Sequence, residues 1–143
     1  PPDGGVSDEA PPEERLRSRI TALLRRITDE NNKDFSIVHK ELANPTGLLK
    51  EVMEEEIRPL QAKMEGLLRQ LLGPRASDKD IRFPVITIVS QCITPMFARR
   101  FKKGRRGPRD IFPGTHDIDA YASHVVKFSL AGIRTIREEA EGK

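Results

Sequence analysis

Apolar residues recur every three or four positions through most of this 143-residue chain, and this feature limits the possible folds most strongly. The spacing matches the 3.6-residue turn of an α-helix and gathers the apolar side chains on one side of it. Apart from one run of β-branched residues within 81–101, no segment looks like a strand that could pair with a neighbour in a sheet. The sequence therefore predicts an all-α fold of five helices, which follow a flexible linker over residues 1–12 that is rich in proline, glycine and acidic residues.

The first two predicted helices span residues 13–29 and 34–43. Glu13 and Glu14 begin the first helix, where the helix dipole favours negative charge. Asp34 can cap the start of the second helix, and Pro45 prevents its continuation.

The third predicted helix begins near Thr46 and ends at Gly73, with Pro59 inside its apolar stripe. Either two helices meet at Pro59 or one helix bends there. The apolar spacing continues unbroken across Pro59, which favours a single bent helix with extra space beside the bend.

The fourth predicted helix, residues 81–101, follows Ser77 and Asp80, which resemble a capping box. Its β-branched run would also suit a strand, but the segment is too long for one. Its own apolar side chains are distributed over nearly all sides of the helix, which predicts burial on more than one face. Pro95 lacks an amide hydrogen, so a carbonyl near Gln91 needs another donor or water.

The last predicted helix, residues 117–139, carries two neighbouring apolar rows. We expect one row to pack inside the chain and the other against a second copy, with Gly132 allowing a close approach; alternatively, Gly132 is an accidental residue in an ordinary core helix. The residues that we assign to the dimer interface are Tyr121, His124, Val125, Phe128, Ser129, Gly132, Ile133 and Ile136.

A second group of residues combines apolar walls with a few hydrogen-bonding side chains, which describes a small-molecule pocket. It describes an ordinary core equally well, and the two prolines inside helices are the features that favour a pocket. The candidate ligand-binding residues are Phe35, Val38, His39, Leu42, Met53, Ile57, Leu60, Gln91, Cys92, Met96 and Phe97.

The positive charge of the chain lies in one segment. The net charge is +3, but residues 99–109 hold seven of the 25 basic residues and no acidic one, so the remainder has a charge of 18 − 22 = −4. The segment is either a solvated connector or a phosphate-binding loop. Aromatic residues make up 5% of the chain, too few for a platform that stacks single-stranded bases.

The sequence contains no recognisable catalytic or metal-binding motif, so we expect neither an enzyme nor a cofactor. The lone cysteine, Cys92, cannot form an internal disulfide, and no segment has the length and apolarity of a membrane span. The first residues lack both an initiating Met and the features of a signal peptide. We therefore expect part of a longer cytoplasmic protein.

The chain resembles the C-terminal sensor and dimerisation domain of TetR-type bacterial transcriptional regulators, in particular the CecR-like subgroup. The resemblance extends through almost all of residues 12–139, and we assign the domain to 13–143. It is carried by PPEERLRSRITALLRRITDE, HKELANPT, LLKEVMEEEIRPLQAKMEGLLRQLLG, IVSQCI and HVVKFSLAGIR.

The resemblance implies a homodimer in which the last two long helices of each copy form a four-helix bundle. It also implies an effector pocket among the earlier helices and a preceding helix-turn-helix domain that binds operator DNA, which these 143 residues do not supply. As a hypothesis, an effector lies beside Pro59 and Pro95 and is oriented by Gln91 or His39. Two alternatives remain: a non-sensing helical interaction module, and a nucleic-acid binder that works through residues 99–109.

Overall fold

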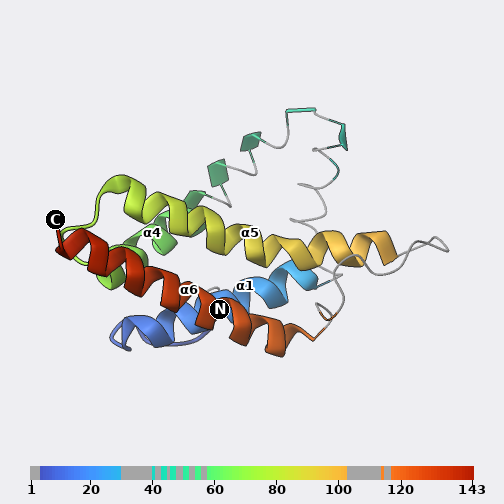
Figure 1. Cartoon of the computed structure of the whole chain (residues 1–143). Helices are drawn as coiled ribbons and strands as arrows, with labels where there is room; N and C mark the ends of the chain where they lie inside the picture. The colour runs from blue at the N-terminus through green and yellow to red at the C-terminus, as the bar shows by residue number, and fades with distance from the viewer. Residues whose placement is uncertain are drawn as a thin grey trace.

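The computed structural model describes residues 4–29, 40, 43–44, 46–47, 50–51, 54–55, 58–102, 114 and 117–143 (Figure 1), with only the backbone for 96–102. The described part of the chain contains four helices: α1 (Pro12–Thr28), α4 (Arg58–Leu72), α5 (Asp78–Lys102) and α6 (Ile118–Glu141). The described residues contain no strand, which confirms the predicted all-α class. The helix predicted over 34–43 falls largely outside these ranges.

Each of the four helices packs against the other three. Helices α5 and α6 run side by side in opposite directions, and α1 lies behind α6 (Figure 1). Leucine, isoleucine and valine side chains from all four helices fill the space between them, among them Leu16, Leu68, Ile88 and Val126. This core leaves the outer sides of α5 and α6 facing away from the other two helices.

Helix α1 forms where the sequence predicted it, with Pro12 in its first turn followed by Glu13 and Glu14. Its buried apolar residues lie three or four positions apart, as the apolar spacing predicted: Leu16, Ile20, Leu24 and Ile27. Ahead of the helix, Gly4 has a φ of +69° and packs so closely against Ser18 that a Cβ atom there would overlap the serine hydroxyl. A glycine is therefore required at this turn.

Helical backbone occurs on both sides of Pro59. Lys50 and Glu51 are α-helical, Glu54 and Glu55 have π-helical geometry, and α4 begins at Arg58. Pro59 has no amide hydrogen for the Glu55 carbonyl, and a wider turn is a common response to such a loss. The intervening residues lie outside the described part, so the single bent helix stays a prediction.

Helix α4 ends at the predicted glycine. Gly73 has a φ of +82°, and its amide donates to the Arg69 carbonyl at 3.0 Å. Arg137 of α6 reaches the same end, where its guanidinium donates to the Leu71 carbonyl at 3.1 Å and to Glu141 at 2.8 Å. This arginine satisfies one of the carbonyls that a helix end leaves without an amide partner.

The predicted capping box forms at the start of α5. The Ser77 amide donates to the Asp80 carboxylate at 2.9 Å, and the Asp80 amide donates to the Ser77 hydroxyl at 3.2 Å. The first of these bonds is the main reason why the pKa of Asp80 lies below its usual value. The segment is a helix, but the expectation that it is buried on several faces is wrong within the single chain, because Phe83 and Ile86 are exposed.

Helix α6 begins after Asp117, whose carboxylate accepts a hydrogen bond from the Ala120 amide at 3.1 Å. Its inner side carries Ala122, Val125, Val126 and Ile133, all buried. None of the described helices is long and apolar enough to cross a membrane.

Candidate functional site

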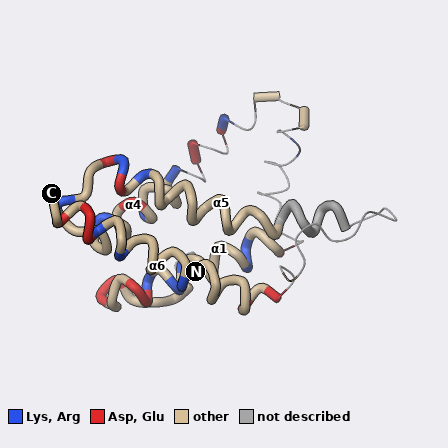
Figure 2. The backbone as a smooth tube through the Cα atoms, viewed as in Figure 1, with Lys and Arg blue, Asp and Glu red and all other residues tan. Residues whose placement is uncertain are grey.

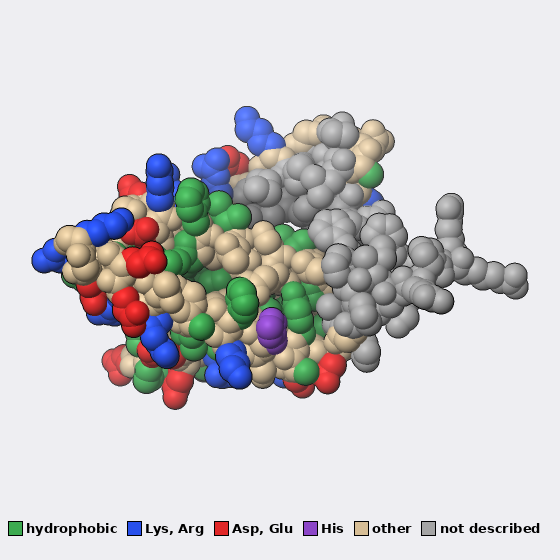
Figure 3. All heavy atoms as spheres, viewed as in Figure 1, with side chains coloured by type: hydrophobic (Ala, Val, Ile, Leu, Met, Phe, Trp, Pro, Cys, Tyr) green, Lys and Arg blue, Asp and Glu red, His purple; other side chains and the backbone are tan. Residues whose placement is uncertain are grey.

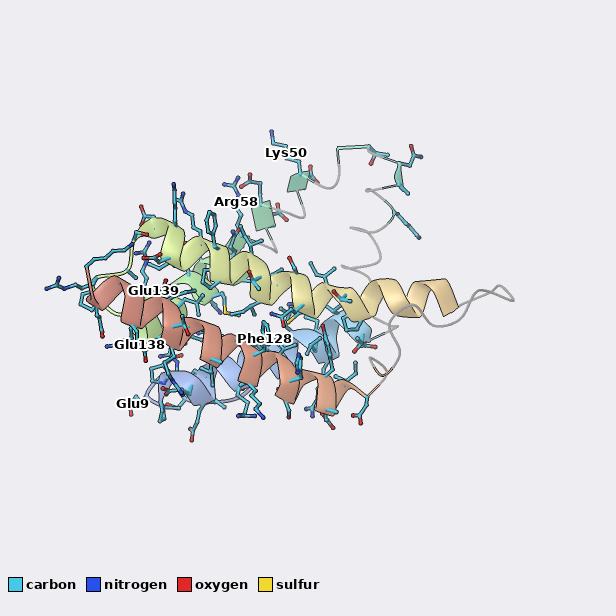
Figure 4. The ribbon with its side chains drawn as sticks, in the orientation of Figure 1. Glu9, Lys50, Arg58, Phe128, Glu138 and Glu139 are labelled. Carbon is cyan, nitrogen blue, oxygen red and sulfur yellow. The ribbon has the colours of Figure 1, made fainter. Side chains whose placement is uncertain are left out.

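The outer sides of α5 and α6 carry the largest apolar side chains that the described part of the chain exposes to solvent. Phe83 is 62% exposed, Ile86 56% and Phe128 61%. Phe128 lies on α6 alongside α5 (Figure 4), and the space-filling view of this side shows hydrophobic side chains at the surface (Figure 3). We call the outer sides of these two helices, from Phe83 to Thr94 and from Tyr121 to Thr135, the α5–α6 face.

Charged residues are nearly missing from the middle of this face. Residues 83–98 contain none, and residues 121–132 contain Lys127 alone. Charges collect instead towards the far end of the molecule, where α6 carries Glu138 and Glu139 (Figures 2 and 4). An exposed surface that combines large apolar groups with few charges is typical of a protein interface.

Three rings of α6 form a row that leads onto the face. The rings of Tyr121 and His124 are stacked with centroids 6.5 Å apart, and those of His124 and Phe128 lie 5.8 Å apart. Residues three and four positions apart share one side of a helix, which explains the row. Tyr121 is half-buried between α5 and α6, whereas His124 and Phe128 are exposed.

The inner end of this row meets the proline inside α5. Pro95 is fully buried, and its missing amide leaves the Gln91 carbonyl without a helical partner. The Tyr121 hydroxyl donates to that carbonyl at 2.7 Å. The sequence predicted that this carbonyl would need a donor but did not identify Tyr121 as that donor.

Burial changes the acid–base properties of the groups at this point. Burial is the main reason that the pKa of Tyr121 is raised; nearby Cys92 adds to the rise, and a hydrogen bond with Thr94 opposes it. Burial alone raises the pKa of the Cys92 thiol to about 12. A thiol that stays protonated is a poor nucleophile, so Cys92 acts as a small apolar core residue.

A known protein-family model matches residues 12–133, or 122 of the 143 residues. The matching family is the C-terminal domain of the HTH-type transcriptional dual regulator CecR. The chain belongs to the CecR C-terminal domain family. Neither the curated proteins nor the solved structures contain a match. The chain is therefore the C-terminal domain of a transcriptional regulator, as the resemblance implied.

Three of the candidate pocket residues of this CecR-type domain are described with their side chains. Leu60 is half-buried, Cys92 is part of the core, and the half-buried Gln91 side chain donates to the Thr87 carbonyl at 3.3 Å. The other candidates have either no described side chain, as in Met96 and Phe97 of α5, or no described position, as in Phe35, Val38, His39, Leu42, Met53 and Ile57. The pocket therefore remains a prediction.

The predicted dimer-interface residues of the domain divide between two sides of α6. His124, Phe128 and Gly132 are exposed on the α5–α6 face, and Tyr121 and Ile136 are half-buried. Val125, Ser129 and Ile133 are instead buried inside the chain, because α1, α4 and α5 pack on that side. The buried Ser129 hydroxyl has no hydrogen-bond partner within the described part of the chain.

Two residues of the face, Phe83 and Ile86 on α5, were missing from the sequence-based interface. The apolar character of α5 on all sides was the available signal. The resemblance placed this helix in the dimer bundle, but no residue of it was assigned to the interface. Within the described ranges, no group of three or more His, Cys, Asp or Glu residues could hold a metal ion. Most of the basic segment 99–109 lies outside those ranges.

Proposed function

We propose that this chain is the effector-sensing and dimerisation part of a TetR-type transcriptional regulator. A small molecule that binds here changes the affinity of the regulator's N-terminal helix-turn-helix domain for operator DNA. The regulator acts in the cytoplasm, and this part of it performs no catalysis and holds no cofactor. The family match supports the regulator assignment, and the exposed α5–α6 face supports the dimer.

The observation that carries the proposal is the composition of the α5–α6 face. Phe83, Ile86 and Phe128 are exposed on it, while Ser90 and Gly132 are small enough to let a second helix approach. A second copy related by a two-fold axis would present the same surface, so apolar groups would meet apolar groups. Two α5 and two α6 helices would then form a four-helix bundle.

We expect Phe128→Arg to prevent the association, because it places a charge where the apolar surfaces meet. Size-exclusion chromatography with light scattering should give the mass of a dimer for the wild type and the mass of a monomer for the variant. Ser123→Arg is the matched control, since Ser123 is exposed on the same helix but outside the α5–α6 face. A dimer of Phe128→Arg as stable as that of Ser123→Arg would contradict the proposal.

The effector pocket, in this proposal, lies beside Pro59 of α4 and Pro95 of α5. Apolar side chains would enclose the molecule, and Gln91 or His39 would orient it. Occupation would change the angles of the helices that contain Pro59 and Pro95. Because α5 also belongs to the dimer face, the change would alter the separation of the two DNA-binding domains.

The pocket is tested by thermal-shift screening with apolar small molecules that carry one or two hydrogen-bonding groups. We expect binders to raise the melting temperature of the wild type and to lose this effect in both Gln91→Leu and Phe97→Trp. Unchanged shifts in both variants would contradict the site. A dimer that no compound stabilises would favour the non-sensing interaction module.

A further inference from the structure

The hydrogen bond from Tyr121 to Gln91 joins a side chain of α6 to the backbone of α5. Within a helix, a carbonyl normally accepts from the amide four residues later, but residue 95 is a proline and has no amide hydrogen. The Gln91 carbonyl therefore lacks its usual α-helical partner and is open to another donor. The geometry gives this role to the Tyr121 hydroxyl, at 2.7 Å.

The same tyrosine begins the ring row that ends on the α5–α6 face. Its ring stacks on His124, and the His124 ring lies 5.8 Å from that of Phe128. The row spans two turns of α6 and passes from a half-buried group to an exposed one. A change in the position of the Tyr121 ring would therefore displace the rings of His124 and Phe128, which would contact a second copy.

We propose that Tyr121 is a positioning residue that couples the proline site of α5 to the self-association of the chain. Its bond to the Gln91 carbonyl fixes the spacing of α5 and α6 and the placement of the ring row. The inference rests on the proposed function, because it requires a second copy on the α5–α6 face. It identifies the Tyr121–Gln91 hydrogen bond as the contact that transmits a change at Pro95 to the dimer interface.

A double-mutant cycle tests this coupling. Tyr121→Phe keeps the ring and removes the donor, so we expect the dimer dissociation constant to rise at least about twofold. The full strength of one neutral hydrogen bond sets an upper limit of about 10-fold, because the bond lies within one chain. Pro95→Ala restores an amide that can donate to the Gln91 carbonyl. In the Pro95→Ala background, Tyr121→Phe should therefore change the dissociation constant by less than about twofold.

The dissociation constant is measured by sedimentation velocity at a temperature where circular dichroism shows every variant to be folded. A purely structural role of Tyr121 would lower the melting temperature and leave dissociation of the folded dimer unchanged. Thr21→Val serves as a control, because it removes a hydroxyl on α1 that donates to the Arg17 carbonyl at 2.9 Å, away from the face. We expect no change in its dissociation constant.

Equal effects of Tyr121→Phe with and without Pro95→Ala would overturn the inference, as would a dissociation constant that Tyr121→Phe leaves unchanged. Both results would leave the dimer itself intact, so the proposed function would survive them. A wild-type chain that stays monomeric would overturn the proposed function and the inference together.

Discussion

At the scale of single residues, Pro95 shows how far a sequence can predict a contact. The absence of an amide hydrogen in proline requires a partner for the Gln91 carbonyl, and the structure provides one. The identity of that partner depends on how α6 passes α5, some 30 residues further along the chain. No local pattern around Tyr121 contains that information.

Cys92 leads to a prediction about stability in alkaline solution. Its pKa rises from 9.0 in the unfolded reference to about 12 in the folded chain, so the unfolded chain ionises first as the pH increases. The contribution of the buried, protonated thiol to the free energy of unfolding is complete below pH 9. It is lost progressively between pH 9 and 12. At about 1.4 kcal/mol for each unit of pKa, the total loss is about 4 kcal/mol.

We expect Cys92→Ala to reduce this dependence on pH, although it lowers stability at neutral pH by leaving a small cavity. Denaturant unfolding of the wild type and the variant between pH 8 and 10.5 measures both effects. The difference in unfolding free energy should shrink as the pH rises. A constant difference across that range would show that the thiol does not ionise on unfolding.

At the scale of helices, local signals predicted the ends well. The Ser77–Asp80 capping box and the end of α4 at Gly73 were both predicted, and each follows from residues within one turn of the helix end. Short-range chemistry determines these features, so the sequence contains what is needed to predict them.

The orientation of helices about their own axes was harder to predict. The two apolar rows of α6 lie next to each other, and the positions of α1, α4 and α5 decide which row is buried. Val125 and Ile133 face inwards for that reason, although their spacing also fitted the outer row. On α5, Phe83 and Ile86 belong to the same apolar run as the core residues Val85 and Ile88, so the sequence pattern alone does not separate the exposed side of the helix from the buried one.

At the scale of the whole molecule, the distribution of charge and apolar area distinguishes one side of the bundle. The charged groups gather towards the ends, and the middle of the α5–α6 face is nearly free of them (Figure 2). The net charge of +3 does not reflect this arrangement, because it comes from the separate segment 99–109. The proposed self-association therefore depends on this surface and not on the overall charge.

Hydroxyl-radical footprinting of the unmodified chain measures the coverage of that surface most directly. Phe83 and Phe128 are 62% and 61% exposed in one copy. If a second copy covers the α5–α6 face, both rings should be strongly protected at concentrations where the chain associates, compared with the same residues in the urea-unfolded chain. Protection should disappear on dilution. Oxidation of both rings at the rate of freely exposed phenylalanine, at every concentration, would contradict the central claim that this face binds a second copy.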